Sequence, residues 1–162
     1  DRMISALPAN EISRLTGIEL AIPYRSIWVV HLGFGARVLK KRGFGYLVPS
    51  EEGERLLGMV WDSEIFGEEK QTRLTAMVRE ESMDPVGDAL GALKRHLEIE
   101  QRPDYVTYQL AEKAIPQFEV GHEEKMAHFE REAAKRFPHL SLVGNYWAGA
   151  SLEACVARAR LV

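Results

Sequence analysis

The sequence predicts an α+β fold, in which helices pack against a largely antiparallel sheet. Several short runs are rich in β-branched and aromatic residues and are bounded by glycine, as strands are. Two longer stretches instead repeat apolar residues every three or four positions, which is the pattern of an amphipathic helix. Strand runs that are interrupted by two helices, rather than alternating with helices one by one, are typical of the α+β class.

The first elements of the chain are short. Residues 3–8 (MISALP) have the pattern of a strand that runs into a turn. The polar residues that follow indicate a helix through Leu15, and Gly17 can end it because glycine readily adopts the left-handed conformation of a helix C-terminus. Residues 26–32 (SIWVVHL) are then typical of a buried strand.

Glycines between residues 33 and 45 predict a stretch of turns. The basic residues 37–42 (RVLKKR) in this stretch indicate a solvated loop or an edge strand, where lysine discourages pairing with another chain. Residues 56–61 and 72–78 are the next predicted strands. The second of these alternates, with one face formed by Leu74, Ala76 and Val78.

The two amphipathic helices are predicted at residues 83–98 and 122–137. In the first, Asp84 can cap the helix and Pro85 suits its first position. Pro138 ends the second, because proline cannot continue a helix. Its expected apolar stripe consists of Met126, Phe129, Ala133 and Phe137. Between the two helices, residues 105–110 (YVTYQL) alternate like a strand.

The last segment carries the clearest signal of a binding site. Residues 140–143 form an apolar run that enters a glycine-rich turn, and the turn opens into a helix that Ser151 can cap. Such a unit brings backbone amides and a helix N-terminus toward a phosphate or an electron-rich ring. Tyr146 and Trp147 beside the turn fit either a ligand contact or a packed anchor. The inward stripe of this helix is expected to be Leu152, Cys155, Val156 and Ala159.

Composition excludes several functions. A formal net charge of −3 leaves no positive footprint for nucleic acid. The single cysteine excludes an internal disulfide and a Cys-based zinc site, and it fits a reducing compartment. No apolar stretch approaches the roughly 18 residues that span a bilayer, and no secretory signal is visible. We therefore expect a cytoplasmic protein.

The sequence assigns no catalytic residue and no metal ligand. His122 and His128 are six positions apart, so a helix places them on different faces. No histidine is legibly paired with Ser151 or Cys155 as a nucleophile would require. The chain contains no G-x-G-x-x-G dinucleotide fingerprint; the nearest match, Gly33-Phe34-Gly35, lacks the third glycine.

Several segments, in this order, resemble the C-terminal part of protoporphyrinogen oxidases, a family of FAD-dependent enzymes of haem biosynthesis. They are residues 3–9 (MISALPA), 43–50 (GFGYLVPS), 56–63 (LLGMVWDS), 73–78 (RLTAMV), 114–122 (AIPQFEVGH) and 144–160 (GNYWAGASLEACVARAR). The chain opens on Asp1 in the middle of a pattern, so we expect a piece of a longer protein. The resemblance implies a crossover strand and turn at 1–15, a substrate-binding domain at 16–112 and a return to the FAD domain at 113–162.

The resemblance also implies an activity and a site. The full-length enzyme would dehydrogenate protoporphyrinogen IX to protoporphyrin IX, with FAD as cofactor and oxygen as electron acceptor, whereas this portion alone would be inactive. The residues that match the family's substrate contacts are Phe44, Gly45, Leu47, Val60 and Met77. Those that match its cofactor contacts are Gly144, Trp147, Gly149, Ala150, Ser151 and Leu152. The implied chemistry is carried by the cofactor, which agrees with the lack of acid–base residues.

Other functions remain open at this point. The same scaffold would suit a coproporphyrinogen III oxidase, an amine oxidase-like flavoenzyme, or a binding module that has lost the chemistry. Arg79-Glu80 stand where the family often has a glycine pair, which favours the last alternative, whereas the intact 43–49 turn argues against it. The expected partner is a small-molecule porphyrinogen; peripheral membrane association and a homodimer are compatible with the resemblance.

Overall fold

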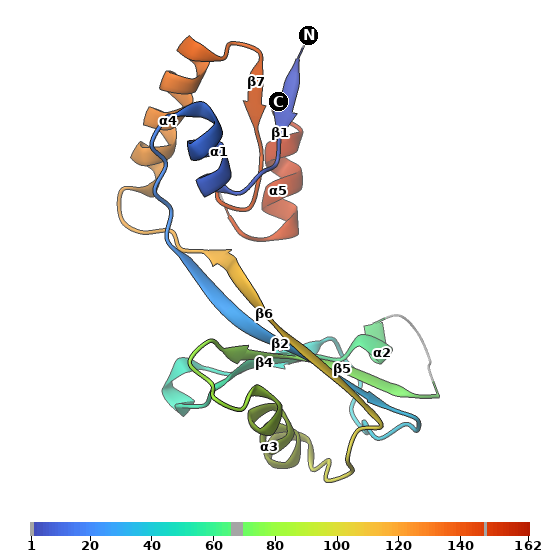
Figure 1. Cartoon of the computed structure of the whole chain (residues 1–162). Coiled ribbons are helices and arrows are strands. Elements are labelled where there is room, and N and C mark those ends of the chain that lie inside the picture. The colour runs from blue at the N-terminus through green and yellow to red at the C-terminus, as the bar shows by residue number, and fades with distance from the viewer. Residues whose placement is uncertain (1, 66–69, 148) are drawn as a thin grey trace. The chain divides into compact units, whose positions relative to one another are not determined.

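The computed structural model describes residues 2–65, 70–147 and 149–162, and it divides the chain into two compact units (Figure 1). Unit 1 comprises Asp1–Arg25 and Lys113–Val162, and unit 2 comprises Ser26–Glu112. Helices, a five-stranded antiparallel sheet and a small parallel sheet confirm the predicted α+β class. Ala148, within the predicted glycine-rich turn, lies outside the described residues.

The large sheet forms the body of unit 2. Its strands, in spatial order, are β3 (Gly45–Leu47), β4 (Leu56–Val60), β5 (Thr72–Arg79), β2 (Tyr24–Phe34) and β6 (Tyr105–Pro116). The alternation predicted for β5 is confirmed, because Leu74, Ala76 and Val78 are buried while their neighbours are half-buried or exposed. The apolar face packs against α3 (Pro85–Leu97), and together they form the core of the unit.

Local sequence signals determine where α3 begins. The side chain of Asp84 accepts a hydrogen bond of 2.9 Å from the backbone N–H of Gly87, and Pro85 takes the first helical position. This confirms the predicted cap. The short helix α2 (Asp62–Ile65) and the 3₁₀ turn Ser50–Glu52 have too few residues to show a helical period, and the sequence did not reveal them.

Unit 1 combines three helices with a two-stranded parallel sheet. Its elements are β1 (Met3–Ser5), α1 (Ala9–Thr16), α4 (His122–Arg136), β7 (Leu140–Leu142) and α5 (Leu152–Ala159). The core residues are Ala9, Ile12, Ile18, Leu20, Met126, Phe129, Ala133, Leu142 and Tyr146. Ile18 and Leu20 also pack in this core, so the first boundary between the two compact units falls after residue 25.

Three details differ from the sequence expectation. Gly45 is paired within strand β3 and is not part of a turn. Phe137 is 37% exposed, because α4 ends at Arg136 and the chain leaves the helical path there. The expected inward stripe of α5 is not buried: Leu152 is 81% exposed and Cys155 is half-buried. The apolar residues of α5 do recur at helical spacing, but the described residues leave this stripe uncovered.

Candidate functional site

Strand register brings three of the predicted substrate contacts, Leu47, Val60 and Met77, onto one face of the large sheet. Leu47 pairs with Gly58, and Gly58 pairs with Met77 on the next strand. One step along, Val60 lies between Gly45 and Thr75. Directly paired residues of antiparallel strands project to the same side, and so do positions two apart. Leu47, Val60 and Met77 therefore share the face opposite the one that packs against α3.

This face offers an apolar wall at its β3 edge. The Leu47 side chain is 80% exposed, and Val60 and Met77 are half-buried. Phe44, just before β3, is 70% exposed, but alternation along the strand does not place it on this face. The apolar surface formed by Leu47, Val60 and Met77 can pack against a flat apolar ligand through dispersion contacts and the exclusion of water.

Two glycines allow β3 to lie close to β4. Gly45 has a φ of 145°, and a Cβ atom built on it would lie 2.1 Å from the carbonyl oxygen of Met59. A Cβ on Gly58 would lie 2.7 Å from the carbonyl oxygen of Tyr46 and 2.8 Å from the Leu47 side chain. Both distances are shorter than a real contact, so the position of Leu47 over the sheet requires glycine at 45 and 58.

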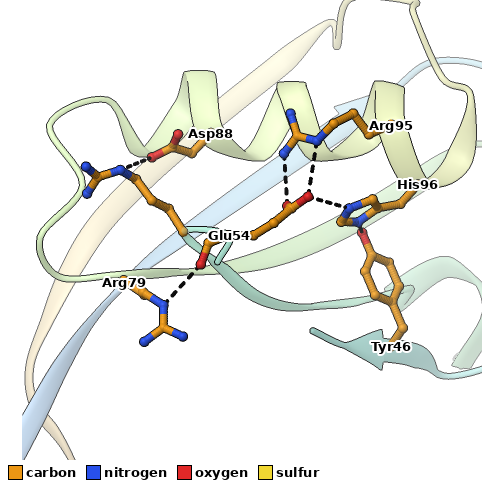
Figure 2. A network of polar contacts seen from close by, with 7 residues as sticks. Tyr46, Glu54, Arg79, Asp88, Arg95 and His96 are labelled. Carbon is orange, nitrogen blue, oxygen red and sulfur yellow. Dashed lines mark hydrogen bonds and ion pairs between the residues drawn. The ribbon is translucent and has the colours of Figure 1, made fainter. Parts of the chain in front are cut away.

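A polar network holds β3 from the other side of the sheet (Figure 2). The Tyr46 hydroxyl lies 2.9 Å from Nδ1 of His96, and Nε2 of His96 lies 3.0 Å from Oε1 of Glu54. Arg95 donates to both Glu54 oxygens, at 3.1 and 2.9 Å. Burial, together with the Glu54 charge, raises the pKa of Tyr46 to about 12, so the phenol keeps its proton. We call these four residues the Tyr46 network.

The Tyr46 network ties the strand that carries Leu47 to the last turn of α3. Three of its members, Tyr46, Glu54 and His96, border a cavity of about 390 Å³. Sequence reasoning missed it, because Tyr46 and His96 are 50 positions apart and periodicity reports only local neighbours. Basic residues in the last turn of α3 were the only available signal.

Acid is expected to weaken the Tyr46 network. The hydrogen bond from Arg95 holds the pKa of Glu54 below its ordinary value of 4.5. A carboxylate whose pKa is lower in the folded state stabilises the fold above its unfolded pKa and loses that contribution as the pH falls through the folded pKa. The Glu54→Gln variant should therefore melt at a lower temperature than the parent at pH 7, and this difference should shrink as the pH falls below about 4.5.

Thermal unfolding at pH 7 and at progressively lower pH checks this expectation. Glu51→Gln provides the control, because Glu51 is an exposed glutamate in the nearby 3₁₀ turn. An equal difference in melting temperature at every pH for Glu54→Gln would contradict the assigned role of the Glu54 charge.

The predicted cofactor residues lie together in unit 1, where β7 leads through the glycine-rich turn into α5. A Cβ on Gly144 would lie 2.7 Å from the Tyr146 ring, and one on Gly149 would lie 2.9 Å from Cβ of Ala154. Ser151 caps α5 by accepting a hydrogen bond of 3.1 Å from the Ala154 N–H. Ala150 and Leu152 on either side are exposed.

This turn fits the electron-rich atoms of a flavin. Its small residues keep side chains away from the backbone, and the first-turn amides of α5 point out of the helix N-terminus, where they can donate to a ring carbonyl or a phosphate. The capping hydroxyl is already engaged with the helix, so the backbone of Ser151 and Leu152, not their side chains, is the group that would contact such a ligand.

Tyr146 and Trp147 have separate roles beside the turn. Tyr146 is completely buried in the core of unit 1, so it is a packed anchor and burial raises its pKa to about 12. Trp147 is half-buried, and the Arg158 guanidinium lies 3.9 Å from its ring centroid. Nε2 of His122 lies 3.1 Å from the Trp147 carbonyl oxygen, and both residues border a cavity of about 720 Å³.

Comparisons with known proteins agree with this architecture. No protein-family model matches the chain. It is 30% identical to the protoporphyrinogen oxidases of Macaca fascicularis and Homo sapiens, over 99% of this chain and 39% of each relative. The chain thus spans about two fifths of the length of the curated relatives it matches.

Solved structures show the same fold. A crystal structure from Exiguobacterium sp. 255-15, provisionally assigned as a protoporphyrinogen oxidase, matches with a TM-score of 0.78 at 20% identity, over 99% of this chain and 40% of that one. Reduced UDP-galactopyranose mutase matches at 0.65 and 16% identity, over 90% and 36%. A putrescine oxidase variant matches at 0.62 and 15% identity, over 99% and 41%.

The fold is therefore that of a C-terminal portion of the flavin amine oxidase-like enzymes. Within that class, the chain is similar to protoporphyrinogen oxidase along nearly its whole length, which confirms the resemblance carried by its motifs. Among the helices of the described residues, none combines the length and the apolar character needed to cross a bilayer.

Proposed function

We propose that this chain is part of an FAD-dependent oxidase that converts protoporphyrinogen IX to protoporphyrin IX in haem biosynthesis, with oxygen as the final electron acceptor. The observation that carries the proposal is the common face of Leu47, Val60 and Met77, beside a glycine that keeps the backbone bare. The similarity to protoporphyrinogen oxidases supports it.

In this proposal, the residues of this chain bind and orient the substrate and the cofactor. Leu47, Val60 and Met77 hold the flat macrocycle and exclude water from one side of it. The backbone at Ser151 and Leu152 would hold FAD by donating N–H groups, as a helix N-terminus does. When bound, FAD supplies the acceptor for the hydride that leaves the porphyrinogen. The chain contains no fingerprint for the pyrophosphate, so we expect the 162 residues alone to purify colourless and inactive.

A charge placed on the wall tests the proposal. In the full-length protein, Met77→Glu should raise KM for protoporphyrinogen IX at least tenfold, because binding would desolvate the carboxylate against an apolar ring at a cost of about 1.4 kcal/mol or more. Met83→Glu is the matched control, since Met83 is 96% exposed and lies outside the wall. Porphyrin fluorescence gives the rates, with coproporphyrinogen III and an amine as comparison substrates.

Each result has a distinct meaning. If the flavin-loaded full-length protein oxidises neither porphyrinogen, the proposed function is overturned. If it binds a porphyrinogen without oxidising it, the protein is the binding module that the sequence analysis left open. Equal KM values for Met77→Glu and Met83→Glu would show that the wall is not part of the substrate site.

A further inference from the structure

One arginine of α5 contacts the glycine-rich turn of unit 1 at two places. Nε of Arg158 donates a hydrogen bond of 3.1 Å to the carbonyl oxygen of Leu142, the last residue of β7. The guanidinium carbon of Arg158 lies over the Trp147 ring, 3.9 Å from its centroid. Arg158 therefore connects the point at which the chain leaves β7 with an aromatic residue of the turn itself.

A third contact fixes the orientation of the guanidinium. Nη2 of Arg158 donates to Oε1 of Glu130 on α4 at 2.9 Å, and the Arg158 side chain is only 15% exposed. A guanidinium is planar and carries several N–H donors, so it can donate hydrogen bonds while it covers an aromatic ring. The three contacts of Arg158 come from β7, the turn and α4, which is more than a single ion pair on the surface provides.

The turn needs such support because its own backbone is permissive. Gly144 has a φ of 145° and Gly149 a φ of 158°, and glycine loses more conformational freedom on ordering than any other residue. Tyr146 anchors the turn in the core of unit 1. Trp147 packs only partly against that core, and Arg158 adds the contact that holds its indole ring.

On the basis of the proposed function, we infer that Arg158 is a positioning residue of the flavin site. It acts through Trp147: the guanidinium holds the indole, and the indole holds the turn that leads into the backbone N–H groups at Ser151 and Leu152. A ligand binds more tightly when the segment that contacts it is already ordered. Loss of Arg158 therefore weakens flavin binding because the turn loosens.

The affinity of the full-length apoprotein for FAD tests the inference. Arg158→Met keeps an aliphatic chain but removes the planar donor, so Kd for FAD should rise about tenfold, the loss typical of one charge-assisted hydrogen bond. Arg160→Met is the matched control, because Arg160 is an exposed arginine two positions further along, and Kd should stay within about twofold of the parent. Titration followed by the quenching of FAD fluorescence measures both.

Two further measurements separate positioning from a loss of stability. If Arg158 acts through Trp147, adding Arg158→Met to Trp147→Leu should raise Kd by less than about twofold, because contacting residues are not additive. The visible circular dichroism of the bound flavin, recorded at saturating FAD, should differ between Arg158→Met and the parent. A loss of stability alone would leave that spectrum unchanged, since only folded protein holds the flavin.

Three outcomes would overturn the inference. A Kd equal to that of the parent would show that the turn does not depend on Arg158, and a raised Kd with an unchanged dichroism spectrum would show a loss of stability alone. Multiplicative effects of Arg158→Met and Trp147→Leu would show that Arg158 does not act through Trp147. If the parent protein binds no FAD, the proposed function fails instead, so the two failures are distinguishable.

Discussion

Replacement of Gly45 by alanine is expected to lower kcat/KM for protoporphyrinogen IX about 100-fold, the loss typical of a 1 Å misplacement in a site. The new Cβ would lie 2.1 Å from the Met59 carbonyl oxygen, and the neighbouring backbone on β4 cannot move away as a flexible side chain would. Strand β3 must therefore leave its pairing and carry Leu47 away from the wall. The positive φ of 145° adds backbone strain of about 1–3 kcal/mol.

The Gly53→Ala variant separates the effect of the steric clash from the effect of backbone strain at a positive φ. Gly53 has a φ of 64°, but an added Cβ would meet nothing within 4 Å. It should lower the melting temperature modestly and leave kcat/KM close to that of the parent. Steady-state assays and thermal unfolding of both variants decide the question. If Gly45→Ala and Gly53→Ala behave alike, the close approach of β3 to β4 is not what holds the wall.

Truncation of Phe129 to alanine is expected to destabilise unit 1 by about 3–5 kcal/mol, which is the usual cost for a buried phenylalanine. The side chain is completely buried on α4 and belongs to the same core cluster as Ile12 of α1, Leu142 of β7 and Tyr146 of the glycine-rich turn. Its loss leaves a cavity beneath the turn that would contact the cofactor. The full-length protein should therefore lose flavin at a lower urea concentration than the parent.

Phe137→Ala is the matched control. The sequence pattern places Phe137 on the same stripe as Phe129, whereas the structure leaves it 37% exposed just beyond the end of α4. We expect it to cost no more than about 1 kcal/mol, as is common for partly exposed positions. Urea unfolding, followed by tryptophan and flavin fluorescence, measures both variants. Equal losses would contradict the burial that distinguishes these two residues.

Local chemistry made most of the fold predictable. Alternation identified β5, and a proline at the first helical position with an aspartate cap identified the start of α3. Gly17 ends α1 with a φ of 66°, as its position indicated. Each of these signals lies within a few residues of the element that it defines, so no knowledge of distant contacts was needed.

The rest of the fold and of the candidate site depends on contacts between residues that are far apart in the sequence. Strand β3 has three residues, and its identity comes from pairing with β4, so Gly45 had the appearance of a turn residue. The stripe of α5 was correctly periodic but says nothing about what packs against it. For the site, the resemblance supplied the residues, and only the register could show that Leu47, Val60 and Met77 share a face. Their contact with substrate remains a prediction.

The Tyr46 network has a consequence for directed evolution. Glu54, Arg95 and His96 support the strand that carries Leu47, yet they act from behind the sheet. Variant libraries at these positions would alter the support of β3 while the chemical composition of the wall stays intact. Under the proposed function, such libraries would offer a route to altered tetrapyrrole preference that leaves every residue of the wall unchanged.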